Sequence, residues 1–503
     1  MTTSIPTSSI QGSIFELVAR GKKDTYFAVD RPTSTLPFNS SYESSAPYIQ
    51  ERRTTVPLNN PQFGNTFEIE IDKFGDVLTE ATLLVDLPTW LPPLPVATNL
   101  TGPTNKTNPP QIANGLYWIT DLCGNSYGYS DYVGLYLFEK IQFYQDQFLI
   151  QEWSGDSLFM TGATEGSWNS MYLADQYLAG VDVGSPGRAI AYRATPGRLR
   201  LDLPLPGLQT PGDGGFPLCC LPSQAYRFRI KLRPLEQLVA TDSTEAPPFG
   251  STTLYPWNVP QFHYTIPATT DASSQEILVT PLARNLIGNP TILLETRQAY
   301  LPHEIRQGLQ TNKQSIPFRR TFENVFTFGE LDYKPLDISG GVATVTRRLD
   351  ARHPVERLQF AFRTANALDR NNYTDFVDPL AEDTQFYQFA KLVIAGKDRE
   401  YEFAPFVWQD LTNYAKDEID TGYNLSEMRW SLGDQMDRGR PFSRVPEGTI
   451  NFTTADRPTL LLQLNDVPRQ RISGLRKTEL RVVMEGWDVY EINEGRGRLL
   501  FAN

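Results

Sequence analysis

An approximate internal repeat constrains the fold of this 503-residue chain more than any other feature. Residues 140–158 alternate polar and apolar side chains, turn near their middle, and continue into a tryptophan, Trp153, and an aspartate. This pattern predicts a β-hairpin that enters a short helix. The same order recurs at residues 392–411, where the tryptophan, Trp408, lies 255 positions after Trp153. The sequence therefore indicates a structural unit that occurs once in each half of the chain.

A second echo shares this spacing. Residues 226–232 alternate cleanly, and residues 480–484, which begin 254 positions later, alternate in the same phase. Two short patterns at one common spacing are harder to obtain by chance than either pattern alone. With the boundary in a connector rich in Thr, Ser and Pro, we expect an arm at 1–26, a first domain at 27–240 and a second domain at 241–503.

The composition favours strands in both domains. Aromatic residues make up 12% of the chain, and 38 prolines with 35 glycines interrupt long helices. We count roughly eight strand candidates in each half, which predicts an all-β protein with two tandem eight-stranded jelly-roll β-sandwiches, long loop insertions and a few short helices. Hairpins are expected between residues 67–71 and 82–85 and between residues 449–452 and 459–464, and the second domain is expected to open with residues 264–282.

The charge balance excludes one large class of partners. The chain has 46 basic and 58 acidic residues, a formal net charge of -12, which repels a phosphate backbone. We therefore expect no direct binding to nucleic acid. The three cysteines, Cys123, Cys219 and Cys220, are an odd number without metal-binding spacing, which predicts neither a disulfide framework nor an oxidising compartment. Residues 1–21 lack the pattern of a secretory signal, and no apolar run is long enough to span a membrane.

Motifs for catalysis are absent from the sequence. The three histidines, His263, His303 and His353, are far apart and have no metal-ligand spacing with each other or with cysteine. A nucleophile elbow and a complete P-loop are also missing. The prediction is no catalytic residue, no cofactor-binding residue and no metal ligand, although the sequence leaves open that two of the 58 acidic residues form a glycosidase pair.

Several segments, taken in order, resemble the major capsid proteins of nucleocytoplasmic large DNA viruses. The resemblance is carried by residues 12–26, 67–78, 132–158, 218–238 and 495–503. It implies two jelly rolls in tandem and trimers of six-sided outline that tile an icosahedral shell. The duplication suits this role independently, because two similar domains in each of three copies present six similar outer faces. The chain departs from the family after the first segment, where it has Leu36-Pro37-Phe38-Asn39.

The resemblance also implies partners and a location. We expect a homotrimer that contacts neighbouring capsomers and minor capsid proteins, in a virion assembled in the host cytoplasm. Residues 1–26 are expected to lie at the inner face of the shell and to contact the viral membrane or its proteins, because a short amphipathic triplet is followed there by a basic cluster: Ile14, Leu17, Val18, Arg20, Lys22 and Lys23.

Two alternatives remain open from the sequence. One is a scaffold protein of the same fold that acts on an immature virion membrane, as in poxviruses. The other is a carbohydrate-binding or carbohydrate-active β-sandwich, in which loop tryptophans act as sugar platforms: Trp90, Trp118 and Trp168. The competing interpretation places these tryptophans in packed interfaces.

Overall fold

The computed structural model describes most of the compact unit Ile49–Asn503, which the pattern of internal contacts separates from residues 1–48. The predicted arm at residues 1–26 lies outside the described residues. The described ranges are 47–90, 118–121, 127–130, 132–165, 199–209, 214–241, 255–266, 275–328, 344–363, 367–368, 371–374, 376, 386–411, 424–430, 448–455, 457–464 and 478–501. Within them, no helix is long and apolar enough to cross a membrane.

Eight strands form a first β-sandwich of two four-stranded antiparallel sheets. One sheet has the order β1 (Ile49–Thr55), β13 (Thr291–Tyr300), β3 (Val77–Asp86), β8 (Leu199–Asp202). The other has the order β2 (Thr66–Glu70), β9 (Tyr226–Leu232), β6 (Phe138–Gln145), β7 (Phe148–Trp153). When the eight strands are lettered B to I in chain order, these are the BIDG and CHEF sheets of a jelly roll.

A second sandwich repeats this order strand for strand. Its BIDG sheet consists of β14 (Gln314–Phe328), β22 (Thr478–Asn493), β16 (Pro354–Arg363) and β19 (Ser426–Arg429). Its CHEF sheet consists of β15 (Thr344–Arg348), β21 (Thr459–Leu464), β17 (Tyr387–Ile394) and β18 (Lys397–Asp398). The predicted double jelly roll is therefore confirmed.

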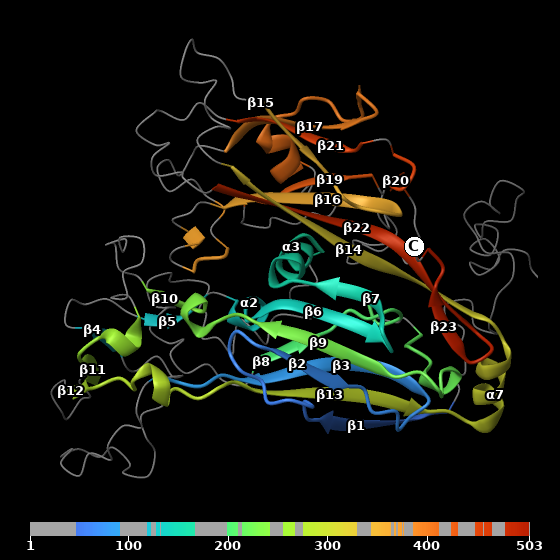
Figure 1. Ribbon diagram of the computed structural model, residues 1–503, viewed down its shortest axis with the longest axis horizontal. Coiled ribbons are helices and arrows are strands. Elements are labelled where there is room, and N and C mark those ends of the chain that lie inside the picture. The colour runs from blue at the N-terminus through green and yellow to red at the C-terminus, as the bar shows by residue number, and fades with distance from the viewer. Residues whose placement is uncertain are drawn as a thin grey trace, which may run out of the picture. The chain divides into compact units, whose positions relative to one another are not determined.

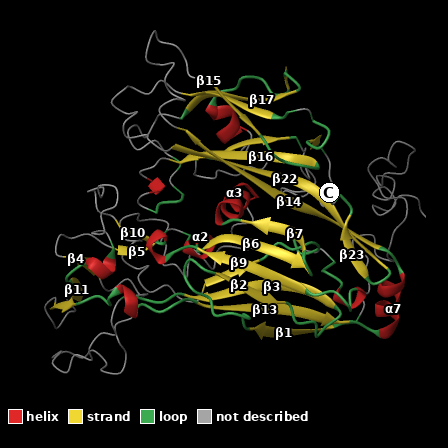
Figure 2. Ribbon diagram, viewed as in Figure 1, coloured by secondary structure: helices red, strands yellow, loops and turns green. Residues whose placement is uncertain are grey.

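Alternation along the strands builds the core of each roll. In β9, Tyr226, Phe228 and Ile230 point inward and are fully buried, while the charged residues between them point outward. In β21 the residues Leu460 and Leu462 do the same for the second roll. Helices are few and short in the described residues, with α3 (Gly155–Glu165) and α7 (His303–Thr311) the longest, as Figure 2 shows.

The four sheets are stacked in one order within the unit Ile49–Asn503 (Figure 1). From one end of the stack to the other they are the CHEF and BIDG sheets of the second roll, then the CHEF and BIDG sheets of the first roll. Helix α3 lies between the inner two of these sheets. The first roll thus places its CHEF side against the BIDG side of the second.

The repeat seen in the E–F hairpins is confirmed. Strands β6 and β7 turn at Asp146, and strands β17 and β18 turn at Ala395 and Gly396, all three with positive φ. A helix follows each hairpin, α3 in the first roll and a π-helical turn at Val407–Leu411 in the second. The second strand of the later hairpin is the short β18, and residues 400–403 form a single bridge, between Phe403 and Ala390.

The second sequence echo is wrong. Strand β9 is the H strand of the first roll, whereas β22 is the I strand of the second, and the topological counterpart of β9 is β21. Alternation identified both strands correctly but carries no information about their place in a sheet. The shared spacing of 254 positions was a coincidence of loop lengths.

The other two expected hairpins, between residues 67–71 and 82–85 and between residues 449–452 and 459–464, are wrong. Strands β2 and β3 follow each other in the chain but belong to different sheets, where β2 pairs with β9 and β3 pairs with β13 and β8. The predicted strand at residues 449–452 is β20 (Ile450–Asn451), which pairs with β16 rather than with β21. In a jelly roll, consecutive strands commonly cross from one sheet to the other.

Strand pairing does not follow the boundary expected between residues 240 and 241. Strand β13 lies between β1 and β3 in the first roll, and β11 (Phe262–Ile266) pairs with β12 (Gln275–Val279) and with β4 (Trp118–Asp121). The described part of residues 264–282 therefore extends an insertion of the first roll instead of opening the second. We propose that the two rolls meet at α7, which connects β13 to β14.

Candidate functional site: the junction between the two jelly rolls

The outer face of the second roll's BIDG sheet is charged where it meets the first roll. On β22 the residues Leu480, Val482 and Met484 point into the second core, so the alternate positions point outward. The charged residues on that outer face come from β22 and from its neighbour β16: Glu479, Arg481, Glu485, Arg357 and Arg363. Arg357, Arg363 and Glu485 are buried. The side chains of Glu479 and Arg481 are 15% and 16% exposed.

Helix α3 of the first roll delivers one carboxylate into this face. Ser154 precedes the helix, its Oγ accepts a hydrogen bond from the amide of Ser157 at 3.0 Å, and Ser157 Oγ accepts one from the amide of Ser154 at 2.8 Å. This reciprocal cap fixes the start of the helix. Gly155 lets the helix approach α2 (Val133–Tyr136), because a Cβ there would lie 2.6 Å from the carbonyl oxygen of Leu135. Asp156 then projects from the first turn.

Asp156 joins the two rolls through arginines. Its Oδ1 lies 2.5 Å from Arg363 Nη2 and its Oδ2 lies 2.7 Å from Arg481 Nη1, both in the second roll. Arg233 of the first roll lies farther off, at 3.8 Å. Burial alone would raise the pKa of the Asp156 carboxyl, but the three guanidinium groups outweigh it and hold this pKa well below its usual range. Asp156 is therefore ionised although it is only 1% exposed.

A second carboxylate shares one of these arginines. Glu323 Oε1 of β14 lies 2.5 Å from Arg481 Nη1. Burial raises the pKa of Glu323, and Asp156 adds to this shift, while Arg481 opposes it. Asp156 and Glu323, which both contact Arg481, thus have pKa values shifted in opposite directions.

Another buried pair lies farther along the same face. Arg357 is fully buried, and its Nε donates to Glu485 Oε2 at 2.6 Å. Glu485 Oε1 also accepts a hydrogen bond from the hydroxyl of Thr161, on α3, at 2.9 Å. Each pole of this ion pair therefore has hydrogen-bonding partners, which is the condition under which a buried pair is tolerated.

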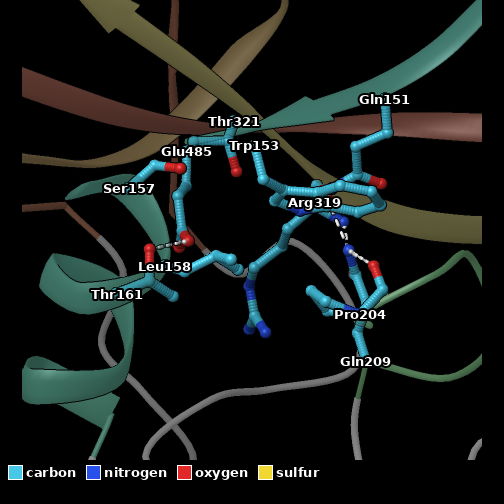
Figure 3. A pocket seen from close by; sticks show the side chains of 10 residues that line it. All are labelled: Gln151, Trp153, Ser157, Leu158, Thr161, Pro204, Gln209, Arg319, Thr321 and Glu485. Atoms are coloured by element: carbon cyan, nitrogen blue, oxygen red, sulfur yellow. Dashed lines mark hydrogen bonds between the residues drawn. The ribbon is translucent and has the colours of Figure 1, made fainter. Parts of the chain in front are cut away.

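A small cavity lies in the junction beside these groups (Figure 3). It measures about 40 Å³ and lies between α3, β7 and the face of β14 and β22. Its lining consists of Gln151, Trp153, Ser157, Leu158, Thr161, Pro204, Gln209, Arg319, Thr321 and Glu485. A water molecule needs at least about 10–15 Å³ of such space, so the cavity has room for a few waters and not for a sugar ring.

Side-chain amides cover the edge of β14 at this cavity. Gln209 Oε1 accepts from the backbone N–H of Arg319 at 2.6 Å, and Gln209 Nε2 donates to the carbonyl of Arg319 at 2.7 Å. Gln151 Nε2 donates to the same carbonyl at 3.0 Å. The amide of Gln209 thus takes the place of a neighbouring strand, which protects an edge that would otherwise be open to pairing.

A third contact region joins the rolls through the last strands. The hydroxyls of Tyr226 and Tyr490 are 2.8 Å apart, and the Tyr490 hydroxyl donates to Gln145 Oε1 at 2.5 Å. Gln145 Nε2 donates to the carbonyl of Gly497, on β23 (Arg496–Leu499), at 2.8 Å. The hairpin of β22 and β23 therefore reaches back to the first roll.

The sequence predicted no site residues, and it missed this junction. Among the described residues no group of three or more His, Cys, Asp or Glu is arranged to hold a metal ion. The junction carboxylates are bound by arginines, and the cavity beside them is too small for a glycan. The signal that sequence reasoning passed over is the polar phase of β22, in which Glu479, Arg481 and Glu485 alternate with apolar residues.

The candidate sugar platform at Trp90 is wrong. Its side chain is 1% exposed and packs against Tyr129 with ring centroids 4.9 Å apart. The side chains of Trp118 and Trp168 lie outside the described residues. Cys219 and Cys220 are free, buried thiols with sulfurs 3.9 Å apart, while Cys123 lies outside the described part of the chain.

Two sandwiches with identical strand order, joined through a buried interface, define a double jelly-roll protein. The fold is similar to that of VP54 of the virus PBCV-1, with a TM-score of 0.61 and 15% identity over 93% of this chain and all of that one. It is also similar to the Faustovirus major capsid protein, with a TM-score of 0.54 and 15% identity over 92% of this chain and 93% of that one. No family model and no curated protein matches the sequence. The chain thus has the fold that its resemblance to large-DNA-virus capsid proteins implied.

Proposed function

We propose that this protein is a structural capsid protein whose homotrimers are the capsomers of an icosahedral virion shell. The observation that carries the proposal is the exact repeat of the jelly-roll strand order within one chain. Three copies of such a chain supply six similar sandwiches, which suit packing in a near-hexagonal net. The solved structures of similar fold include that of the PBCV-1 virus capsid and that of the Faustovirus major capsid protein.

The junction supports a mechanical role. Asp156, Glu323 and Glu485 of the two rolls are held by arginines across or beside the interface, and aromatic rings add to it, with Tyr136 and Tyr373 stacked at 4.7 Å. An interface of oriented, buried ion pairs fixes one relative placement of its two sides, since any other placement leaves a charge without its partner. A shell subunit needs such a fixed shape.

The same junction argues against catalysis as the main role. A glycosidase needs two carboxyl groups about 5–10 Å apart on either side of a sugar. Asp156 and Glu323 both contact the guanidinium of Arg481, which occupies the space between them. We infer that the carboxylates of the junction serve structure.

Partners and location follow from the capsid role. The trimers would contact neighbouring capsomers and minor capsid proteins in the virion, after synthesis and assembly in the host cytoplasm. Residues 1–26 would lie on the inner side of the shell, toward the viral membrane. A scaffold of the same fold on an immature virion membrane is the second candidate, and the presence of the protein in mature particles distinguishes the two.

The experiment that tests the proposal is the mass of the purified protein in solution by light scattering. A trimer has about 170 kDa, three times the chain mass of 56.8 kDa. Negative-stain images of the same fraction should show particles with a six-sided outline. A monomer at micromolar concentration would overturn the proposal.

A further inference from the structure

The outer face of the first roll's BIDG sheet repeats the charged pattern of its counterpart in the second roll. Arg297 Nε lies 3.2 Å from Glu80 Oε2, and Arg52 Nε lies 3.4 Å from Glu295 Oε1. Arg200 contacts Glu80 as well. These residues project from β1, β3, β8 and β13 on the side away from the core. We call this surface the first-roll face.

The first-roll face is open where its counterpart is covered. At its centre, Leu84 and Leu293 are directly opposite each other on β3 and β13, and both are half-buried. In the second roll the outward residues Ala361 and Val483 are 2% and 0% exposed, because the first roll packs on them and includes them in its core. The side chains of Arg52, Arg200 and Arg297 remain 45%, 32% and 35% exposed.

The other end of the stack exposes aromatic side chains. After the E–F hairpin of the second roll, Tyr401, Phe403 and Phe406 are 79%, 40% and 58% exposed. Two acidic residues accompany them, Asp398 and Glu402, both about half exposed and paired with Lys391. We call residues 398–406 the aromatic segment. Three neighbouring exposed aromatics are typical of a contact surface, in which aromatic residues are enriched.

The aromatic segment has the same place in the chain order as a part of the junction. In the first roll, the E–F hairpin ends at Trp153 and continues into the start of α3, and these residues lie against the BIDG face of the second roll. In the second roll, the aromatic segment follows the E–F hairpin in the same topological position. No sheet of the described chain lies against it on the outer side of the stack.

We propose that the aromatic segment of one copy of this chain docks on the first-roll face of a second copy, in the way that the first roll docks on the second within one chain. The acidic residues of the segment would meet the partly exposed arginines of the face, as Asp156 meets Arg363 and Arg481. The inference rests on the proposed trimer and names its contact. Such a contact is head-to-tail, and a head-to-tail contact closes into a ring when its rotation permits.

Two variants test the contact, one in the aromatic segment and one on the first-roll face. Tyr401→Asp with Phe406→Asp places charge in the aromatic segment, and Leu293→Asp places charge at the centre of the first-roll face. Arg52→Glu is a second face variant in case Leu293→Asp does not fold, since the Arg52 side chain is 45% exposed. Phe148→Asp is the matched control, because Phe148 is 75% exposed on the first-roll hairpin and takes no part in the proposed contact.

Light scattering at micromolar concentration should give a trimer for the wild type and for Phe148→Asp, and folded monomers for the segment and face variants. Mixing the two variants should give a dimer of about 114 kDa, twice the chain mass, because the mixture has one intact pair of surfaces and cannot close a ring. Trimeric segment and face variants beside a trimeric wild type would overturn this contact alone and leave both surfaces to another protein. A monomeric wild type would overturn the proposed function as well.

Discussion

The two BIDG faces of this chain have the same strand order and the same alternation of arginine and carboxylate, yet they differ in their surroundings. In the second roll, α3 and β7 cover the face, and Arg357, Arg363 and Glu485 are almost completely buried. In the first roll, the described residues leave the corresponding pairs between Arg297, Glu80 and Arg200 partly exposed. The comparison shows that burial, and not the pattern of charges, decides how much the ion pairs on such a face contribute to stability.

The difference follows from solvation. An exposed ion pair contributes about 0–1 kcal/mol, because water screens both charges. A buried pair has lost its water, so its net contribution to stability is small, but the loss of one partner leaves the other charge uncompensated at about 3–5 kcal/mol. The covered face is therefore sensitive to substitution and specific in its geometry, whereas the open face is tolerant until a partner covers it.

Of the substitutions that test this comparison, Asp156→Asn should change the stability of the protein most. It keeps the shape of the side chain but removes the buried carboxylate that Arg363 and Arg481 share, so we expect a loss of about 3–5 kcal/mol in the free energy of unfolding. Denaturant titration followed by tryptophan fluorescence measures this change. Glu139→Gln, which removes an exposed partner of Lys231, is the control and should change stability by less than about 1 kcal/mol. Equal effects of the two substitutions would contradict the distinction between buried and exposed ion pairs.

Lowering the pH should have the second-largest effect, because it removes the stabilisation that ionised Asp156 provides on the covered face. The pKa of Asp156 is depressed in the folded chain, so its stabilisation is fully present above the unfolded pKa of about 3.9 and is lost as pH falls below that value toward the folded pKa. One such group changes stability by at most about 1.4 kcal/mol per pH unit. Glu323, whose pKa is raised, has the opposite slope and acts above its unfolded pKa of about 4.3.

The melting temperature between pH 5 and pH 3 tests this expectation. The wild type should lose stability more steeply below pH 4 than Asp156→Asn, which has no carboxyl to protonate. Parallel curves for the two proteins would show that other carboxyl groups dominate the acid response.

Glu80→Gln should have the smallest effect. Glu80 forms ion pairs with Arg200 and Arg297 on the open face. In the monomeric segment variant, Tyr401→Asp with Phe406→Asp, the loss of these exposed pairs should change stability by about 0–1 kcal/mol. If a second copy covers this face, the same substitution should lower the melting temperature of the trimer more than that of the monomer. Thermal melts of Glu80→Gln in both backgrounds measure the difference, and an equal shift would indicate that the face stays open.

The local part of this architecture could be predicted from the sequence. Residues 226–232 and 459–464 match β9 and β21 to the residue, and the turn expected at residues 395–398 includes Ala395 and Gly396, both with positive φ. Alternation shows which side chains share a face of a strand, because its period is two, but strands with the same alternation are interchangeable as partners. The hairpins expected between residues 67–71 and 82–85 and between residues 449–452 and 459–464, and the second echo, failed for this reason.

The junction could not be predicted, because its partners lie far apart in the chain. Asp156 meets Arg363 and Arg481 only after both rolls have formed, and no local pattern encodes that meeting. The outward positions of β22 did contain a signal that this face is covered. Glu479, Arg481 and Glu485 share these positions with Val483, which is apolar and fully buried. An apolar residue in the polar phase of a strand is the signal that indicates a covered outer face.

The pairing of β1 with β13 determines when the first BIDG sheet can form during synthesis. Ile49 is opposite Tyr300, so the first BIDG sheet has no strand between β1 and β3 until some 250 residues after Ile49 have left the ribosome. At about 5–20 residues per second, β1 and β3 wait for roughly 10–50 s before β13 arrives between them. The surface assigned to a second copy is thus among the last parts of the first roll to exist, and a nascent chain cannot join a shell through it before that roll is complete.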